Sequence, residues 1–499
     1  MKSLKFTTLF WRIYALVLAA MFVGSASAEN MTEAWVRRGI FTPTPSAVAV
    51  DTDGTLFVVG GTSDYMTVAY SPEGVLLWTN IYKGPWSTDA ATAVAVGSDG
   101  TVFVTGDSHG GSPNYLDYST IAYSHEGLPL WTNRYNGPGN VADTPAAIAV
   151  GHNGDVFVTG GSATIGYSLD GVPLWTNAYA GSGYNFGGRA LAVSAGGTVI
   201  VAGKGNGYTT IAYSQGGIPL WTNSYGAGHE VTAMAVATDG AVFVTGYAYG
   251  SGGYFDYATI AYSHIGVALW TNRYSGLFSN SDDRATALAL GTNGTVFVTG
   301  YSGASSGPDY ATIAYSHEGI PLWTNRYNGT ANAHDYAHSV AVDASGHVFV
   351  TGDSFGSGSS GDFATITYSH EGMPLSTNRY NSPSNYYDGV GSFAIVPDGV
   401  VVVGYSITSR FGRDGTVVKY ITSPPGYNTL SGLLTEDGAM RLSYMGLPST
   451  SYALERTFNL APPDWAPQIT NTADAAGAIV FTNAPDSTTN NFWRVRSVP

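Results

Sequence analysis

Short apolar segments, separated by turns rich in Gly, Asp, Asn and Ser, follow one another along most of this chain. Within many segments apolar and polar residues alternate, as in Ala-Thr-Ile-Ala-Tyr-Ser at residues 258–263. Successive side chains of a β-strand point to opposite faces, so this alternation predicts strands. Turns such as Asp99-Gly100 contain residues that tolerate a positive φ, as tight hairpins need. The pattern predicts an all-β protein.

Two phrases recur along the chain at similar intervals. One is a short apolar strand that ends on Gly, as in Val102–Gly106, and its spacings are 46, 54, 43, 43, 54, 52 and 52 residues. Its closing glycines are Gly60, Gly106, Gly160, Gly203, Gly246, Gly300, Gly352 and Gly404. The other phrase contains Leu-Trp-Thr-Asn, with Trp at 78, 131, 175, 221, 270 and 323 and Ser376 in the seventh copy. Self-similarity at this period indicates a repeat architecture.

Each repeat contains four short strands, which we call a to d in chain order. Strand a is rich in Ala, as in Ala91–Val96, and strand b is the Gly-closed phrase. Strand c is the Ala-Thr-Ile-Ala-Tyr-Ser segment, as at residues 258–263, and strand d contains the Trp. Four strands in a repeat of this length are typical of a β-propeller blade. Small residues suit the strand nearest a crowded axis, and bulky residues suit the outer rim.

The two ends of the array complement each other. The eighth repeat stops after 416–420, which matches strand c, and it has no strand d. Residues 34–38 match strand d, and Trp35 precedes Trp78 by 43 residues, one blade period. We therefore expect an eight-bladed propeller closed by its N-terminal strand, which would remove the free sheet edges. Seven blades with one divergent extra repeat remain the alternative.

The repeats resemble the bacterial β-propeller repeat family of secreted proteins (SBBP-type repeats) over about residues 34–421. Asp256-Tyr257-Ala258-Thr259, Asp309-Tyr310-Ala311-Thr312 and the Gly-closed phrases match that family's pattern. The resemblance implies the fold. It implies no common ligand or reaction, because one fold hosts many functions.

The N-terminus has the features of a secretory signal peptide over residues 1–28. Lys2, Lys5 and Arg12 precede the apolar run 13–23, and Ala26-Ser27-Ala28 is a small-residue cleavage site. We expect cleavage before Glu29 and a secreted, extracellular or periplasmic protein without a membrane span. An uncleaved anchor helix is the alternative, although the run is short for a span.

The repeat pattern ends at Ser423-Pro424-Pro425-Gly426. We expect the propeller to occupy residues 29–422 and a linker to occupy 423–430. Candidate strands at 439–444, 451–457, 478–482 and 492–497 predict a small β-sandwich over residues 431–499. Tyr452–Arg456 and Phe492–Arg496 resemble C-terminal immunoglobulin- or fibronectin-like modules of secreted bacterial proteins.

Composition excludes several classes of function. The formal net charge is −15, which argues against nucleic acid and against anionic membranes as partners. The chain has no cysteine, which excludes disulfides, thiolate metal sites and thiol catalysis.

The recurring Trp, Asp and His residues have structural explanations in the repeat. A Trp in nearly every blade favours packing between blades over sugar stacking, and Ser376 then predicts a weaker contact in blade 7. His125, His264, His317 and His370 lie in turns of different blades, where we expect them exposed. His334 and His338 lie four apart without an evident third metal ligand.

Carboxylates recur before strands a and c, where each can accept hydrogen bonds from its own turn. Calcium binding by these oxygens is the alternative, and we expect no other cofactor and no metal site. The residues before strand a are Asp89, Asp143, Asp283, Asp335 and Asp388, and those before strand c are Asp117, Asp256, Asp309, Asp362 and Asp414.

The a–b and c–d turns are short and uniform, whereas the b–c and d–a loops are long, variable and aromatic. We call these two sides of the propeller the turn face and the loop face. Variable loops on a rigid scaffold usually hold the functional site. Short b–c loops predict a ligand-binding depression over blades 3 and 4, walled by Tyr115, Tyr184, Phe186, Arg189, Tyr208, Tyr249, Tyr254 and Phe255.

The sequence therefore predicts a non-catalytic, monomeric binding or scaffolding protein whose partner is a polysaccharide or a cell-surface protein. The alternative is a propeller enzyme: a polysaccharide lyase, a hydrolase or a quinoprotein-like dehydrogenase. The Gly-x-x-x-Trp spacing of Gly127–Trp131 resembles quinoprotein dehydrogenase propellers. That family's Asp is replaced by Tyr123 and Tyr315, and its adjacent cysteine pair is missing.

Overall fold

The computed structural model describes residues 31–39, 44–61, 63–86, 88–110, 116–138, 142–179, 187–205, 207–226, 229–250, 252–278, 280–409, 412–422, 430–434, 440–445, 451–458, 465–474, 478–483 and 492–497. The chain divides into two compact units, Glu33–Ile421 and a second formed by the residues on either side of it. The predicted signal peptide lies outside the described residues. Among the residues described, we find no helix long and apolar enough to cross a membrane.

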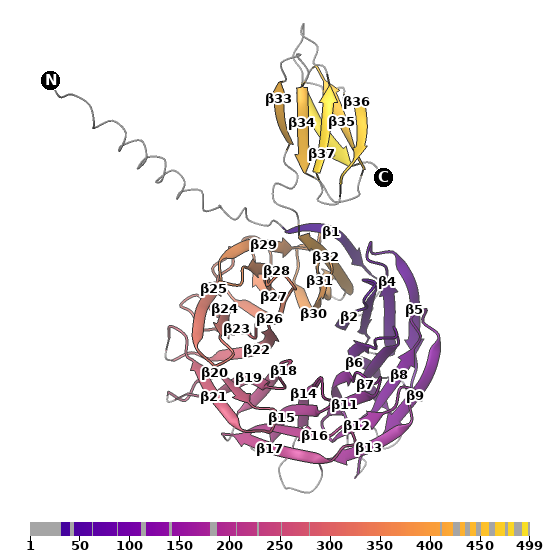
Figure 1. The fold of residues 1–499 in the computed structure, drawn as a ribbon, viewed down its shortest axis with the longest axis vertical. Helices are drawn as coiled ribbons and strands as arrows, with labels where there is room; N and C mark the ends of the chain where they lie inside the picture. The colour runs from indigo at the N-terminus through magenta and orange to yellow at the C-terminus, as the bar shows by residue number, and fades with distance from the viewer. Residues whose placement is uncertain are drawn as a thin grey trace, which may run out of the picture. The chain divides into compact units, whose positions relative to one another are not determined.

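The larger unit consists of eight four-stranded antiparallel sheets, arranged as blades around one axis (Figure 1). Blades 1 and 2 contain β2 (Pro45–Val50), β3 (Leu56–Gly60), β4 (Tyr65–Tyr70), β5 (Leu76–Tyr82), β6 (Asp89–Val96), β7 (Val102–His109), β8 (Leu116–Tyr123) and β9 (Pro129–Tyr135). Blades 3 and 4 contain β10 (Pro145–Val150), β11 (Val156–Gly160), β12 (Ala163–Tyr167), β13 (Pro173–Ala178), β14 (Gly187–Val193), β15 (Val199–Gly205), β16 (Gly207–Tyr213) and β17 (Pro219–Tyr225).

Blades 5 and 6 contain β18 (Glu230–Val236), β19 (Val242–Tyr249), β20 (Phe255–Tyr262), β21 (Ala268–Tyr274), β22 (Asp283–Leu290), β23 (Val296–Ser302), β24 (Asp309–Tyr315) and β25 (Pro321–Tyr327). Blades 7 and 8 contain β26 (Asp335–Val342), β27 (Val348–Phe355), β28 (Gly361–Tyr368), β29 (Pro374–Tyr380), β30 (Asp388–Val396), β31 (Gly399–Ser409), β32 (Gly412–Thr422) and β1 (Met31–Arg38). The prediction of an all-β propeller of four-stranded blades is confirmed.

Each core cluster of the propeller joins two neighbouring blades rather than filling a single blade. Phe57 and Val59 of blade 1, for example, are fully buried against Val102, Val104 and Ile121 of blade 2. Strand b is buried on both faces because it lies between two blades, which explains its unbroken apolar sequence. Each blade therefore depends on its neighbour to bury its apolar residues, so a single blade would not be stable alone.

The eighth blade joins the two ends of the array. β1 pairs with β32 in the sheet β1-β32-β31-β30, in the place that strand d takes in other blades. Val401 and Val403 of this blade share a core cluster with Leu56 and Val58 of blade 1. These contacts are consistent with the closure and the blade number expected from the sequence.

The repeated Trp connects each blade to the next. The Trp78 indole donates to the His125 carbonyl at 2.8 Å, and Asn80 donates to the Gly127 carbonyl at 2.7 Å. A Cβ at Gly127 would lie 2.6 Å from the Trp78 ring, so only glycine fits beneath the indole. The same contact recurs for Trp35, Trp131, Trp175, Trp221, Trp270 and Trp323 with Gly74, Gly171, Gly217, Gly266, Gly319 and Gly372. The predicted role of the Trp in packing between blades is confirmed.

Ser376 takes the place of this Trp in the one blade whose neighbour lacks the matching glycine turn. The fourth strand of blade 8 is β1, so no c–d hairpin follows β32 in that blade. Ser376 instead donates to the Thr367 hydroxyl at 3.1 Å. Blade 8 thus lacks the glycine turn on which an indole would dock, and the weaker contact expected at Ser376 stays a prediction.

The smaller unit is a β-sandwich of two three-stranded sheets. Its strands are β33 (Leu430–Leu434), β34 (Met440–Met445), β37 (Ala478–Asn483), β36 (Ala466–Thr472), β35 (Ser451–Thr457) and β38 (Phe492–Ser497). Leu442, Leu454 and Phe481 form its buried core. Four of the six strands were predicted, whereas β33 and β36 were missed.

Candidate functional site

The carboxylates that precede strand c form ion pairs within their own blades. In blade 7, Arg379 lies 2.8 Å from Asp362 and also donates to the Ser354 hydroxyl and to the Tyr327 hydroxyl of blade 6. The same pair occurs as Asp117–Arg134, Asp256–Arg273 and Asp309–Arg326. A guanidinium therefore already provides the positive charge next to each of these four carboxylates.

The carboxylates that precede strand a are fully buried and anchor the d–a loops. Gly84, Gly276 and Gly329 donate their backbone N–H groups to Asp89, Asp283 and Asp335 at 2.6, 2.6 and 2.7 Å. Burial raises the pKa of Asp283, and the nearby Asp256 carboxylate adds to that rise. The recurrence of the two sets of Asp is therefore explained by ion pairs within blades for one set and by hydrogen bonds to the d–a loops for the other.

The turn histidines connect neighbouring blades instead of standing free in solvent. His125 lies 3.3 Å from Asp53 of the preceding blade, and its ring meets Phe57 edge to face. His317 contacts Asp239 and Phe243 in the same way. The expectation of exposed turn residues was wrong for these two, because each side chain bridges a gap between two turns.

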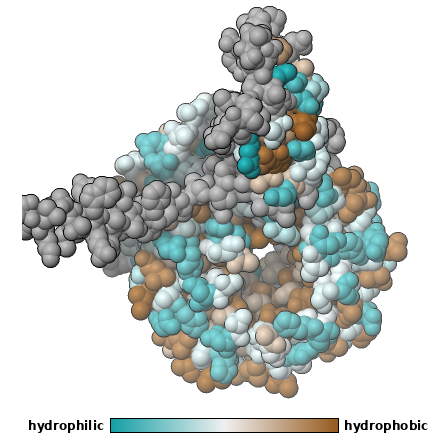
Figure 2. All heavy atoms as spheres, turned by 45° about the horizontal axis from the view of Figure 1, so that its top comes forward, coloured by the Kyte–Doolittle hydropathy of each residue, from teal (hydrophilic) through white to brown (hydrophobic). Residues whose placement is uncertain are grey.

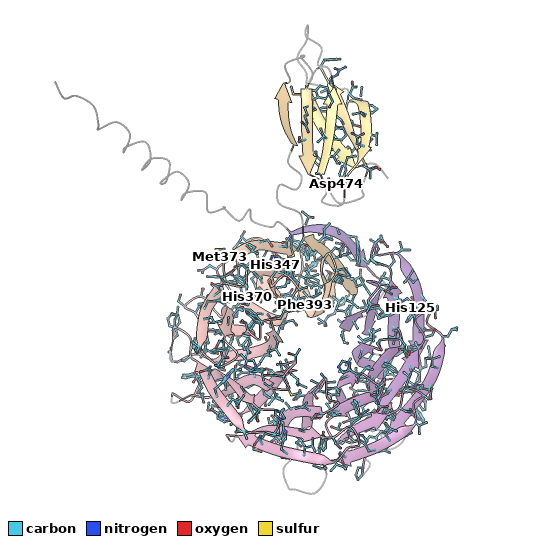
Figure 3. The ribbon with its side chains drawn as sticks, viewed as in Figure 1. His125, His347, His370, Met373, Phe393 and Asp474 are labelled. Carbon is cyan, nitrogen blue, oxygen red and sulfur yellow. The ribbon has the colours of Figure 1, made fainter. Side chains whose placement is uncertain are left out.

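Asp51, Asp53 and His125 bring three metal-ligand atoms within 4.8 Å of one another. His370 makes the equivalent contact with the turn of the preceding blade, where its Nε2 lies 2.8 Å from the uncharged amide of Asn293. Because the contact persists without a carboxylate, we assign it a structural role. Figure 3 shows that His125 and His370 lie on different blades, so they cannot share a ligand.

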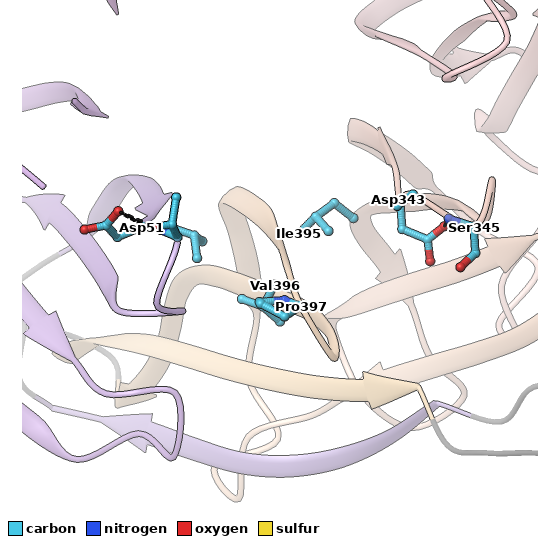
Figure 4. Close-up of a pocket in the computed structure, with 9 residues that line it drawn as sticks. Asp51, Asp343, Ser345, Ile395, Val396 and Pro397 are labelled. Carbon is cyan, nitrogen blue, oxygen red and sulfur yellow. Dashed lines mark hydrogen bonds between the residues drawn. The ribbon is translucent and has the colours of Figure 1, made fainter. Parts of the chain in front are cut away.

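A depression of about 390 Å³ lies on the turn face between blades 7, 8 and 1 (Figure 4). It forms because only two residues, Pro397 and Asp398, connect β30 to β31, whereas the neighbouring turns are longer. Its lining includes Ile395, Asp51 and Asp343. Asp343 accepts hydrogen bonds from two backbone N–H groups of its own turn, and Thr52 donates to Asp51. The carboxylates are thus accounted for by the turns.

His338 lies beside a buried carboxylate at the loop face of blade 7. Its Nε2 is 3.0 Å from Asp353, which also accepts from the Tyr387 hydroxyl at 2.5 Å and the Val390 N–H at 2.7 Å. His334 contacts the Tyr336 hydroxyl instead. The two histidines thus have separate partners, and the spacing of four residues does not build a common site.

Three of the predicted wall residues, Tyr115, Tyr184 and Phe186, lie outside the described residues. Arg189 is exposed on β14 of blade 4. Tyr208 was wrongly placed in the wall, because it is fully buried and donates to the Ala258 carbonyl of the next blade at 3.3 Å. It occupies the position of Tyr257 and Tyr310 in other blades, which the alignment of repeats could have revealed.

The remaining three predicted residues, Tyr249, Tyr254 and Phe255, come together on the b–c loop of blade 5. The rings of Tyr249 and Phe255 are stacked, with centroids 4.4 Å apart and an interplanar angle of 26°. Tyr249 is 50% exposed and Tyr254 is 43% exposed. We call Tyr249, Tyr254, Phe255 and their partners Tyr247 and Arg284 the blade-5 platform.

The guanidinium of Arg284 holds two rings of the platform in place. The Arg284 guanidinium lies over the Phe255 ring at 4.6 Å and over the Tyr247 ring at 4.9 Å. Asp282 fixes this arginine at 2.7 Å and also accepts the Phe255 backbone N–H at 3.0 Å. The stack is therefore preorganised, which lowers the entropic cost of binding a ligand on its free face.

The neighbouring d–a loop adds exposed apolar residues that sequence reasoning missed. Leu277 is 78% exposed, and Phe278 on the same loop is exposed as well. Asp282 ties this loop to Phe255, so the two loops form one surface. Exposed apolar patches of this kind on a soluble scaffold mark interaction sites. Arg284 was not predicted as a member of this surface, because the sequence does not show which charged side chain contacts an aromatic ring of another strand.

The blades, their axial Ala-rich strands and the repeated contacts between blades define the larger unit as a β-propeller. No family model matches the chain, and no curated protein matches it. The solved C-terminal WD40 domain of Sif2 has a TM-score of 0.53 at 9% identity, covering 79% of this chain and 99% of that domain. This likeness supports the fold alone.

Two other solved structures are less similar. A chain of the mitotic checkpoint complex has a TM-score of 0.45 at 12% identity, covering 72% of this chain and 95% of that chain. The extracellular domain of a hybrid two component system from B. thetaiotaomicron has a TM-score of 0.40 at 12% identity, covering 94% of this chain and 55% of that chain.

Proposed function

We propose that this protein is a non-catalytic binding or scaffolding propeller that holds a polysaccharide or a cell-surface protein on its loop face. The observation on which the proposal rests is the blade-5 platform, where exposed Tyr249 and Tyr254 adjoin a preorganised aromatic stack. Two exposed tyrosines offer flat apolar faces and hydroxyl groups at little conformational cost. Such surfaces suit sugar rings and protein side chains alike.

The position of the platform revises the site expected over blades 3 and 4. Tyr247, Tyr249, Tyr254 and Phe255 belong to blade 5, and Arg284 belongs to β22 of blade 6. Tyr184 and Phe186 on the loop before β14 stay part of the proposed surface. The proposal therefore extends the binding surface from blade 4 to blade 5.

The same proposal includes three further points. The chain belongs to the secreted β-propeller repeat family, it is exported by the predicted signal peptide, and its C-terminal unit is an immunoglobulin- or fibronectin-like module. The formal net charge of −15 supports a neutral or basic partner. The charged groups of the platform, Arg284 and Asp282, form an ion pair with each other, which fits a structural role better than acid–base chemistry.

The test is binding of the mature protein to a panel of polysaccharides and cell-surface extracts. We expect Tyr249→Ala and Phe255→Ala each to weaken binding by about two- to tenfold, since one stacking contact is worth about 0.5–1.5 kcal/mol. Tyr184→Ala and Phe186→Ala test the blade-4 part of the surface. Isothermal titration or surface plasmon resonance measures the affinity.

Trp86 provides the matched control, because it is an exposed aromatic residue on the loop before β6 of blade 2, away from the platform. Trp86→Ala is expected to leave the affinity unchanged. Absence of binding to every panel member would contradict the binding function. Unchanged affinity in all four of these variants (Tyr249→Ala, Phe255→Ala, Tyr184→Ala and Phe186→Ala) would contradict the location alone.

A further inference from the structure

The outer strand of every blade has one edge that pairs with no other strand in the described part of the propeller. Such an edge presents free N–H and C=O groups and can pair with a strand of another molecule. Figure 2 shows apolar patches at intervals around the rim of the ring. The outer strands differ in how they protect this edge.

Two devices protect most of the outer strands. Five of them begin with proline, which lacks the N–H that an added strand would bond. These prolines are Pro129, Pro173, Pro219, Pro321 and Pro374. Five outer strands carry an arginine near their end, and a charge on an edge opposes pairing with another chain. These arginines are Arg134, Arg273, Arg326, Arg379 and, on β1, Arg37.

The outer strand of blade 1, β5, lacks both devices. Leu76 pairs with Tyr70 in the register in which Pro129 pairs with Tyr123 in blade 2. Ile81 pairs with Met66 in the register in which Arg134 pairs with Ser119. β5 is therefore a seven-residue edge without a charged residue and without proline.

The side chains that distinguish β5 are exposed. Leu76, Leu77 and Ile81 are 48, 49 and 54% exposed. Leu77, Thr79 and Ile81 point to one face of the strand, since successive side chains alternate. Antiparallel pairing of β5 with a second β5 about a two-fold axis at Thr79 would place Leu77 opposite Ile81 in both directions and Thr79 opposite Thr79.

We propose that this chain forms a two-fold homodimer through β5, in which blade 1 of each copy joins into one continuous eight-stranded sheet. The apolar sequence around Thr79 is self-complementary, as an interface with two-fold symmetry requires. Aliphatic pairs and a Thr–Thr pair directly opposite each other stabilise antiparallel strands. In blade 2 the same register would place Leu130 opposite Arg134, which explains why β5 and not β9 is the pairing edge.

A contact made mainly by one strand from each copy is smaller than the standard interface of about 1,600 Å². We therefore expect a dimer of micromolar affinity, visible as a mass that rises with concentration. This dimer would replace the monomer expected from the sequence. It leaves the blade-5 platform free, because blade 5 and blade 1 are different blades, so the inference does not depend on the proposed function.

Sedimentation equilibrium or light scattering of the full chain from about 1 to 200 μM tests the proposal, a range that brackets a micromolar dissociation constant. The variant Leu76→Pro with Ile81→Arg gives β5 the residues that other blades have at these positions, so the blade fold tolerates both. We expect the wild type to approach twice the monomer mass and the double variant to stay monomeric throughout.

Ala178→Arg is the matched control, because it adds the same charge at the corresponding position of blade 3. This variant is expected to dimerise like the wild type. A wild type that stays monomeric at the highest concentration overturns the proposal. A double variant that dimerises like the wild type also overturns it, because the contact then lies elsewhere.

Discussion

At the scale of single residues, the repeat uses the same contact many times, and glycine makes it possible. The indole of one blade lies directly on a glycine of the next, where φ is positive and no Cβ fits. Both demands act on one residue, and each excludes other amino acids. The repeated glycine and the repeated Trp are therefore the two partners of one contact between neighbouring blades.

This contact predicts a difference between two glycines of blade 5. Gly253 and Gly266 both have φ near +80°, but a Cβ at Gly266 would lie 2.7 Å from the Trp221 ring, whereas one at Gly253 meets nothing within 4 Å. Gly253→Ala should lower the free energy of unfolding by about 1 kcal/mol through backbone strain alone. Gly266→Ala should lower it by about 3 kcal/mol, because the ring must also move. Urea unfolding measures both, and equal losses would contradict the contact.

A second prediction at this scale concerns Asp107 on the loop face of blade 2. Burial raises the pKa of Asp107 to about 6. One of its oxygens is buried without a hydrogen-bond partner, whereas the corresponding Asp353 of blade 7 accepts from Tyr387 and Val390. Ala142 and Pro145 take the places of these two donors next to Asp107, and proline has no N–H.

The folded protein thus binds the Asp107 proton more tightly than the unfolded chain, whose Asp has the usual pKa near 4. Between about pH 6 and pH 4 the stability contribution of Asp107 rises as the pH falls, and above pH 6 the ionised group lowers stability. Asp107→Asn should therefore raise the melting temperature at pH 7 and lose this advantage toward pH 4. Thermal melts at both pH values test it, and a variant less stable at pH 7 would contradict it.

At the scale of elements, blade 8 is the place where the two ends of the array meet, and we call the pair β1 and β32 the seam. No hairpin connects these two strands. β1 completes blade 8 without a c–d hairpin and is held by side chains instead. The Trp35 indole donates to the Pro72 carbonyl at 3.1 Å, and Arg37 donates to the Gly74 carbonyl at 2.6 Å, where other blades use Asn. Lys419 on β32 also donates to the Pro72 carbonyl at 3.0 Å. Blade 1 thereby holds both partners of the seam.

The seam predicts an uneven response to loss of the Trp. Trp35→Ala and Trp323→Ala remove equivalent half-buried indoles, and each should cost about 2 kcal/mol, less than a fully buried Trp. β1 can then leave the sheet locally, whereas β25 stays connected to β24 by its hairpin. Hydrogen exchange should speed up in β32 for Trp35→Ala and remain slow in β24 for Trp323→Ala. Equal protection of both strands would contradict a distinct seam.

At the scale of the whole molecule, the two faces and the rim of the propeller differ in how regular they are. The turn face is uniform, and its Asp and His residues hold neighbouring blades together. The loop face differs from blade to blade, so a single irregular patch, the blade-5 platform, stands out on a regular ring. On the rim, β5 is the described outer strand that has neither a proline at its start nor an arginine near its end. In a repeat protein such departures from the common pattern can be compared position by position, and both of our proposals start from them.

For the propeller, the sequence alone determined the strands, the four-stranded repeat, the eight repeats and the complementary ends of the array, whereas it missed β33 and β36 of the smaller unit. These follow from local properties, since alternation, turn residues and spacing act within a few residues of each other. Three of the five platform residues were also named from the sequence, because Tyr249, Tyr254 and Phe255 lie on one short loop or at its two ends. Tyr208 was misplaced because a Tyr in a loop and a Tyr at the start of a strand look alike without the register.

Only the tertiary structure decided what the repeated residues contact. Trp78 and its partner His125 are 47 residues apart, and Ser376 has no indole because blade 8 has no hairpin opposite it. Arg284 joins the platform through a guanidinium stacked on rings from another strand. Such contacts depend on how neighbouring blades pack and where their loops end in space. Local backbone preference cannot specify these positions, and the closed ring does.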